Sequence, residues 1–212
     1  MEYQSRNKIR AVLFDLDGVL VDSEGIYTDF WAAVDRQYPT GVENFAYVIK
    51  GTTLTEILGR YFPDSDIREK ICLLLRKQEN EMVYRLFDGI IPMLEELRRR
   101  GIMTAIVTSS NRRKMQSLFE AIPELEALTD TVVTDEDVTE SKPSPQGYLL
   151  AARRLGVTPG EYAVVEDSLA GLRAGRAAGA LVIGISTTNP VEKVSPLSDM
   201  VLSTAAELAE KI

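Results

Sequence analysis

The sequence predicts an α/β protein with a parallel, doubly wound sheet, interrupted after its first strand by a helical insertion. Two observations predict this class. Short apolar runs rich in β-branched residues are continuous rather than alternating, as in strands that are buried on both faces. Helical patterns separate these runs, and such alternation is typical of a parallel sheet with helices on both faces.

The predicted strands are short apolar runs at residues 11–14, 104–107, 131–133, 162–165 and 181–185, with 200–202 as a short sixth. The helices between them are predicted at 91–100, 112–120, 145–155 and 168–179. We expect Ser144 to cap the helix that Gly156 terminates. Gly171, Gly175 and Gly179 lie among alanines in the last helix, which indicates a helix packed closely on the sheet.

The segment from residue 24 to residue 87 has a helical pattern and contains no convincing buried strand. The residues that recur there at helical spacing, and so indicate a face packed in a core, are Ile67, Ile71, Leu74, Leu75, Gln78 and Met82. The chain re-enters the sheet near Gly89. We therefore predict a Rossmann-like core domain formed by residues 1–22 and 89–212, and an inserted helical domain formed by residues 23–88.

The chain of 212 residues contains no histidine and a single cysteine, Cys72. The lack of histidine excludes Ser-His and Cys-His catalysis and every histidine-bound zinc site. Any chemistry must therefore use carboxylates, hydroxyls, lysines and, where needed, a hard metal ion. A single cysteine excludes an intrachain disulfide, which suits a reducing compartment.

The formal net charge is -8, from 24 basic and 32 acidic side chains. A net-acidic surface repels phosphate backbones and anionic lipids, so we expect neither nucleic acid nor a membrane as a partner. No apolar run approaches the roughly 18 residues of a membrane helix. The polar start at Met1–Ser5 does not resemble a secretory signal. We expect a cytoplasmic, monomeric protein.

Polar side chains gather where the predicted strands end, and ligands of open parallel sheets bind beyond these carboxyl ends. Asp15 and Asp17 follow the first strand, and Gly18 permits a sharp turn, so both carboxylates should leave the backbone on the same side. The other polar residues at this edge are Thr108, Ser109, Ser110, Asn111, Lys142, Glu166 and Asp167. Taken singly, each group has an ordinary explanation as a helix cap, a turn or a surface loop. Their order and spacing together favour a site.

Carboxylates at this density need a counter-ion. At about 4 Å and an effective dielectric near 20, each like-charge pair costs about 4 kcal/mol, and a phosphate dianion facing a carboxylate meets roughly twice that. Oxygen ligands from Asp15, Asp17 and Asp167 suit magnesium, which keeps waters and accepts a substrate phosphate. Because a divalent ion and the ammonium of Lys142 reverse the sign of this interaction, the sequence predicts Mg²⁺-assisted chemistry on a phosphorylated substrate.

Four segments together resemble the haloacid dehalogenase superfamily. Residues 14–24, which read FDLDGVLVDSE, resemble its first motif, and Thr108 matches the hydroxyl of the second. Lys142-Pro143 resembles the third motif, and residues 164–168, which read VVEDS, resemble the fourth. The match spans nearly the whole chain in the family's order. The insertion resembles the helical cap of the beta-phosphoglucomutase-like and phosphoglycolate phosphatase-like branch.

The resemblance also implies catalytic roles. Asp15 would be the nucleophile that forms an aspartyl-phosphate. Asp17 would protonate the leaving alcohol and then activate the water that hydrolyses the intermediate. Thr108 and Lys142 would hold phosphate oxygens, with the backbone N–H of Ser109 adding a further contact.

The same resemblance implies the metal ligands and a substrate loop. Asp15, the main-chain carbonyl of Asp17, and Asp167 would bind Mg²⁺, with Glu166 in or just behind the ligand sphere. Lys50-Gly51 resembles a cap loop that meets the substrate in this branch, although a plain turn explains these two residues equally well.

The leading hypothesis is a phosphatase of small phosphorylated metabolites such as sugar phosphates, because Asp17 equips the chain to hydrolyse an acyl-phosphate. The alternative is a beta-phosphoglucomutase-type mutase, for which the resemblance implies a cap histidine and a loop arginine. Here Tyr27 stands about where that histidine would fall, and residues 52–54 supply no arginine. Dehalogenases lack an equivalent of Asp17. A receiver-type phospho-acceptor module shares the acidic pair, but its aspartate follows the third strand and it has no such insertion.

Overall fold

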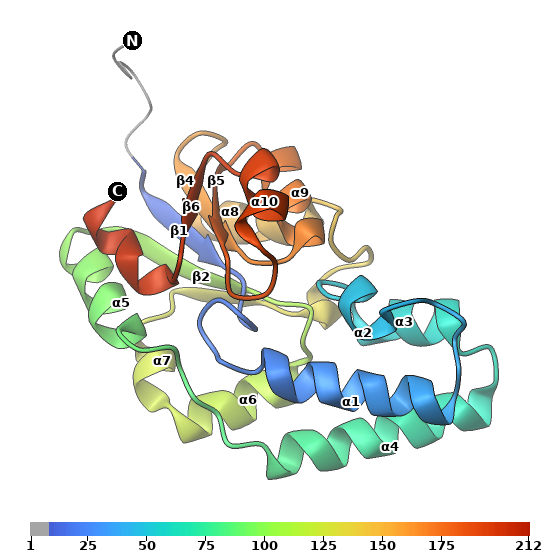
Figure 1. Cartoon of the computed structure of the whole chain (residues 1–212). Helices are drawn as coiled ribbons and strands as arrows, with labels where there is room; N and C mark the ends of the chain where they lie inside the picture. The colour runs from blue at the N-terminus through green and yellow to red at the C-terminus, as the bar shows by residue number, and fades with distance from the viewer. Residues whose placement is uncertain (1–8) are drawn as a thin grey trace.

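The computed structural model of the protein describes residues 9–212, with a parallel β-sheet at its centre (Figure 1). Over these residues the sheet has six strands in the order β3-β2-β1-β4-β5-β6. The strands are β1 (Ala11–Phe14), β2 (Met103–Val107), β3 (Thr131–Val133), β4 (Tyr162–Glu166), β5 (Leu181–Ile185) and β6 (Met200–Leu202). The predicted α/β class and each predicted strand are confirmed. The polar segment Met1–Ser5 lies outside the described residues.

The strand order places β1 at the centre of the sheet. On one side Leu13 of β1 lies opposite Ala105 of β2, and on the other side it lies opposite Val164 of β4. The chain fills one half of the sheet with β2 and β3 and then crosses to β4, so the order reverses at β1. A crevice at the carboxyl ends of the strands is expected at such a reversal, and this is where parallel sheets bind ligands.

Helices cover both faces of the sheet, and alternate residues of β1 enter opposite cores. Val12 and Phe14 join one hydrophobic cluster, whereas Ala11 and Leu13 join the other. The first cluster includes residues of α5 (Ile90–Arg99), α6 (Arg112–Ala121), α7 (Pro123–Ala127) and the 3₁₀ helix η3 (Ala205–Glu210). The second includes residues of α8 (Gln146–Leu155) and α9 (Leu169–Ala177). Two-sided burial explains why the strands are continuously apolar.

Shorter elements complete the described chain. These are α10 (Val191–Val194) and the 3₁₀ helices η1 (Asp135–Asp137) and η2 (Ser195–Leu197). Val194 of α10 packs with Leu172 and Val182 in a small cluster beside α9. Across residues 9–212, none of the helices has the length and apolar character that crossing a membrane requires.

The start of α8 differs by one residue from the prediction. Pro145, not Ser144, occupies the N-cap position and provides no side-chain cap, and the helix begins at Gln146. The Ser144 hydroxyl accepts a hydrogen bond from the Gln146 N–H at 3.4 Å, which is a local turn rather than a helix cap. Gly156 ends the helix in the left-handed conformation with a φ of 67°, as predicted.

The insertion after β1 consists of helices in the described chain, as predicted. They are α1 (Glu24–Gln37), α2 (Phe45–Val48), α3 (Leu54–Tyr61) and α4 (Ser65–Glu81), and they lie together beyond one end of the sheet (Figure 1). Their apolar side chains form a separate cluster around Trp31, Phe45 and Phe62. Phe45 meets the rings of Trp31 and Phe62 edge-on, with centroids 6.0 and 5.9 Å apart. The division into domains at residues 22/23 and 88/89 stays a prediction.

The apolar face of α4 is narrower than predicted. Ile71, Leu75 and Met82 are buried, but Leu74 is 42% exposed, so its assignment to the core was wrong. Successive residues of a helix are turned by about 100°, so the face centred on Ile71 and Leu75 leaves Leu74 at its edge.

Helix α9 packs closely on the sheet through its glycines. The Ser168 hydroxyl caps the helix by accepting the Gly171 N–H at 3.0 Å. One turn later, a Cβ added to Gly175 would lie 2.8 Å from a methyl group of Val164 in β4. The close approach expected from the glycine spacing is confirmed, and it brings the N-terminus of α9 to the carboxyl end of β4.

We expect Gly175→Ala to destabilise the protein by about 1–3 kcal/mol, because the added methyl group overlaps Val164 in a packed core. Gly59→Ala in α3 is the matched control, since a Cβ there meets nothing within 4 Å. The control should be neutral or stabilising by about 0.5–1 kcal/mol, because alanine favours the helix. Urea unfolding measures both variants. Equal free energies of unfolding for the two would contradict the close packing.

Candidate active site

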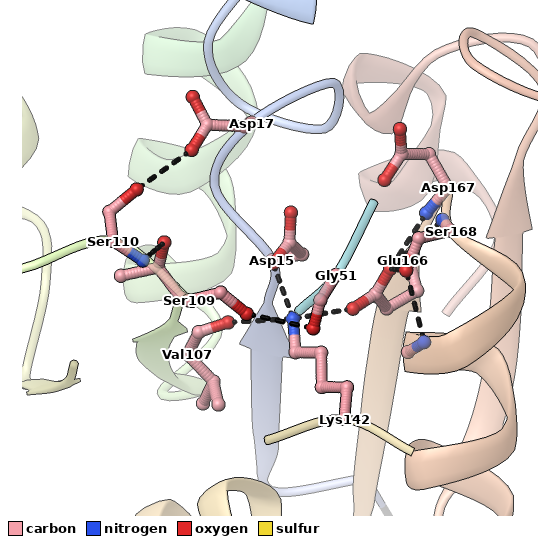
Figure 2. Close-up of polar contacts among 12 residues, drawn as sticks. Asp15, Asp17, Gly51, Val107, Ser109, Ser110, Lys142, Glu166, Asp167 and Ser168 are labelled. Carbon is pink, nitrogen blue, oxygen red and sulfur yellow. Dashed lines mark hydrogen bonds and ion pairs between the residues drawn. The ribbon is translucent and has the colours of Figure 1, made fainter. Parts of the chain in front are cut away.

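Asp15 lies at the carboxyl end of the central strand. Its backbone N–H donates to the carbonyl of Val165 at 3.0 Å, which ties the end of β1 to the end of β4. The residue is 9% exposed, so its carboxylate is nearly out of water. As Figure 2 shows, Asp15, Lys142, Glu166 and Asp167 lie together at this edge. The structure therefore brings these four predicted residues into one place.

The ammonium of Lys142 lies between two carboxylates. It forms a short ion pair with Asp15 and donates to Glu166 Oε1 at 2.6 Å and to the carbonyl of Val107 at 3.1 Å. Burial alone would lower the pKa of Lys142, but the charges of Asp15 and Glu166 and the hydrogen bonds to them raise it above its ordinary value. Lys142 is therefore a fixed cation, with its donors turned toward the ends of β1, β2 and β4.

Glu166 is fully buried, and both its oxygens accept hydrogen bonds. Oε1 accepts from Lys142 and from the Tyr148 hydroxyl at 2.8 Å. Oε2 accepts the backbone N–H groups of Asp167 and Ser168, both at 3.1 Å, and the Ser168 hydroxyl at 3.0 Å. A Cβ at Gly171 would lie 1.7 Å from Oε1, so this carboxylate depends on glycine at that position. Glu166 therefore holds Lys142 and the start of α9 in place at this edge.

Asp15, Glu166 and Asp167 form a group of carboxylates suited to a metal ion. Each offers an oxygen within 4.8 Å of the others. Burial raises the pKa of Asp15 to about 8, with the charges of Glu166 and Asp17 adding to the rise and Lys142 opposing it. With all three carboxylates ionised, they and the ammonium of Lys142 carry a formal charge of −2, which a divalent cation would offset. An all-oxygen donor set is what hard cations such as Mg²⁺ and Ca²⁺ prefer.

Gly18 makes room for one of these carboxylates. It has a φ of +82°, and a Cβ there would lie 2.2 Å from Oδ2 of Asp167. The loop after β5 braces the same region, because Thr187 donates to the Gly18 carbonyl at 2.6 Å and Asn189 donates to the Asp167 carbonyl at 3.0 Å. The sharp turn after Asp17 thus lets Asp167 approach Asp15.

The carboxylate of Asp17 has a different counter-ion from that of Asp15. Lys114 donates to both of its oxygens at 2.6 Å, the Ser110 hydroxyl donates at 3.1 Å, and the Ser23 hydroxyl is in close contact (Figure 2 shows the Ser110 bond). Burial alone would raise the pKa of Asp17, but the charge of Lys114 and these hydrogen bonds outweigh burial and lower the pKa below its ordinary value. The two carboxylates are therefore paired with different lysines, Lys142 and Lys114, and their sharing of one metal ion stays a prediction.

Lys114 is a further residue of the site that the sequence pattern did not predict. It lies in the first turn of α6, next to the buried Met115 and four residues before the buried Leu118, and is itself 2% exposed. A lysine on the apolar face of a helix was the available signal, since lysine is rarely buried unless it is paired. The pairing partner, Asp17, is 97 residues away in sequence, which no local pattern reveals.

Thr108 and Ser109 follow β2 to the same edge. Thr108 is buried, and its hydroxyl accepts the Ser110 N–H at 3.0 Å. The Ser109 hydroxyl donates to the carbonyl of Gly51 at 2.9 Å, which joins the insertion to the sheet edge (Figure 2). Their predicted contacts with phosphate stay predictions, as does the Asp17 carbonyl as a metal ligand.

A pocket lies between the inserted helices and the sheet edge. Its lining includes Asp17 and the predicted substrate-binding residues Lys50, Gly51 and Ser109. Aromatic and aliphatic side chains of the insertion, among them Trp31, form the opposite wall. Thr108 and Lys142 line a smaller adjoining hollow.

Known proteins resemble the chain over nearly its whole length. The family model for haloacid dehalogenase-like hydrolases matches residues 9–179. Beta-phosphoglucomutase from Mycobacterium bovis is 31% identical, with 95% of this chain and 92% of that protein covered. Hexitol phosphatase A from Escherichia coli is also 31% identical, covering 95% and 94%. The crystal structure of CbbY from Rhodobacter sphaeroides in complex with phosphate has a TM-score of 0.76 at 27% identity, covering 94% of this chain and 96% of that one.

We expect Lys142→Met to destabilise the metal-free protein by about 3–5 kcal/mol, because it leaves buried carboxylates without their cation. Lys193→Met, at an exposed lysine of α10, is the control and should stay within about 0.5 kcal/mol of the parent. Urea unfolding in the presence of a chelator measures both. A loss no greater than that of the control would show that Lys142 does not hold the carboxylates together.

Proposed function

The chain belongs to the haloacid dehalogenase-like hydrolase family, in its beta-phosphoglucomutase-like branch, and from this premise we propose that it is a magnesium-dependent phosphatase of small sugar phosphates. The observation that carries the proposal is the cluster of Asp15, Glu166 and Asp167, in which Asp15 and Glu166 pair with the ammonium of Lys142. This cluster carries an excess of negative charge that a divalent cation would offset, and it includes the carboxylate of Asp15 at the end of the central strand.

The reaction assigned to these residues has two steps. The Asp15 carboxylate attacks phosphorus, the bond from phosphorus to the alcohol oxygen breaks, and Asp17 gives the departing alcohol its proton. Water then attacks the aspartyl-phosphate, Asp17 takes the proton from this water, and the Asp15 oxygen is released with inorganic phosphate. Throughout, Lys142 faces the reacting oxygens, with Thr108 and Ser109 beside it. Asp15, Asp167 and the Asp17 carbonyl would hold a divalent cation, which would supply the positive charge that phosphoryl transfer needs.

A phosphosugar mutase is the second candidate, favoured by the similarity to beta-phosphoglucomutase. Such an enzyme must return the phosphoryl group to a second hydroxyl of the same sugar. The histidine and arginine that the resemblance implies for mutases are absent from the sequence positions concerned: Tyr27 lines the pocket, as does Thr52 after Gly51. This difference supports hydrolysis as the outcome.

The other expectations follow from the family. A sugar phosphate as substrate is supported by the similarity to hexitol phosphatase A and by a pocket that combines hydroxyl, amide and carboxylate groups with Lys50. Asp15 follows the first strand and precedes the helical insertion, which counts against a receiver-type module. Cytoplasmic location and a monomeric state remain predictions.

We expect Asp15→Asn to reduce phosphate release from sugar monophosphates by at least a factor of about 10³, because an amide cannot act as the nucleophile. Asp22→Asn is the matched control, since Asp22 lies in the same segment but is exposed. Phosphate release in the presence of Mg²⁺ measures both variants, and a chelator should abolish the activity of the parent. Equal rates for Asp15→Asn and the parent would refute the nucleophile.

Phosphorus NMR of α- and β-glucose 1-phosphate with the protein and Mg²⁺ separates the two candidate reactions. We expect inorganic phosphate to accumulate without glucose 6-phosphate, because Tyr27 and residues 52–54 do not supply the mutase side chains. Appearance of glucose 6-phosphate without net phosphate release would instead establish the mutase.

A further inference from the structure

A buried lysine of α6, Lys114, contacts the side chain of Asp17. The Lys114 side chain is 1% exposed, and its ammonium donates to both oxygens of Asp17 at 2.6 Å and to the Ser110 hydroxyl at 3.0 Å. The Asp17 side chain keeps 19% exposure and lines the pocket below the inserted helices. One face of this carboxylate thus meets Lys114 while the residue still reaches the place where a leaving group would bind.

The position of Lys114 is itself fixed by the start of α6. Asn111 caps this helix, and its side-chain oxygen accepts the backbone N–H of Lys114 at 2.9 Å. From the insertion, the ring of Tyr27 covers the ammonium at 4.3 Å from its centroid and helps to exclude water. Lys114 is therefore held by the helix cap beneath it and by an aromatic ring above it.

Contact with both carboxylate oxygens has a consequence for orientation. The hydroxyls of Ser23 and Ser110 bond different oxygens of Asp17 and together oppose rotation of the carboxylate about its last bond. An ammonium bonded to both oxygens restricts that rotation, and charge-assisted bonds are about twice as strong as neutral ones. General acid–base catalysis requires the proton-bearing oxygen within hydrogen-bond reach of the reacting oxygen.

We propose that Lys114 is a positioning residue. It fixes the Asp17 carboxylate toward the pocket between the inserted helices and the sheet edge, where the leaving group would bind. The inference rests on the proposed function, because it assigns Lys114 a part in the same two steps. In the first step, the bond from Asp15 to phosphorus forms, the bond to the alcohol oxygen breaks, and a proton passes from Asp17 to that oxygen. In the second, Asp17 takes a proton from the attacking water as the bond from Asp15 to phosphorus breaks.

The test uses 4-nitrophenyl phosphate, whose leaving group departs without a proton donor. Formation of the phosphorylated protein from this substrate does not need Asp17, but its hydrolysis does. With Lys114→Met, we expect the first burst of nitrophenolate to keep its rate constant, while the following steady phase slows on the order of tenfold. With a sugar phosphate, whose alcohol needs the proton, both steps should slow. Rapid-mixing absorbance and phosphate release measure these phases.

Arg112→Met is the matched control. It removes a cation two residues earlier in α6, and with it an exposed ion pair to Asp137 that does not touch Asp17. Both phases should match the parent. Lys114→Met should also add nothing to Asp17→Asn, because a residue that acts only through Asp17 has no effect once Asp17 is changed.

A merely structural role for Lys114 predicts a different result. The burst amplitude, which counts active sites, would fall, while both rate constants per site would stay at the parent values. That result, or additive effects of Lys114→Met and Asp17→Asn, would overturn the inference. Should Lys114→Met not fold, Lys114→Gln, which removes the charge but keeps one donor, is expected to show the same split. Failure of the proposed function itself would appear separately, as an active Asp15→Asn variant.

Discussion

The structure depends on the accumulation of buried negative charge at the carboxyl end of β1. Carboxylates that leave water must be hydrogen-bonded and paired with cations, or they become neutral. Around Asp15 this requirement determines which residues the neighbouring elements carry. Lys142 reaches in from the segment before α8, Tyr148 of α8 donates to Glu166, and glycine at position 171 leaves space for the Glu166 side chain. The negative charge that Lys142 leaves unbalanced is what makes the site suitable for a divalent cation and, with it, a phosphate.

The two aspartates of the first motif are neutralised separately, and this separation suits their proposed work. Asp15 is paired with Lys142 inside the acidic cluster, whereas Asp17 is paired with Lys114 at the wall of the pocket. A nucleophile must face phosphorus with its charge shielded, while a proton carrier must face the leaving group. The chain bends at Leu16, between the two aspartates, and their carboxylates have these different surroundings.

The strands could be predicted because burial on both faces requires a continuous run of apolar residues, and each run ends in polar residues. The edge that carries Asp15, Lys142 and Asp167 followed from strand direction alone. Lys114 could not be found in this way, since its partner lies on another element and helical spacing alone marks it only as an unusual member of an apolar face. The same limit explains Leu74, for which the pattern of α4 gave the period of the buried face but not its width. For Ser144, the local sequence suited a cap, but the helix begins one residue later, after Pro145.

The insertion has its own hydrophobic cluster and meets the sheet edge through polar contacts such as that between Ser109 and the Gly51 carbonyl. Mutations in the wall around Trp31 can therefore accumulate without disturbing the packing that aligns Asp15 with Lys142. In such a chain, the residues that select the substrate can change while the residues that carry out the reaction are kept. Descendants can acquire new substrates while the chemistry at Asp15 stays the same.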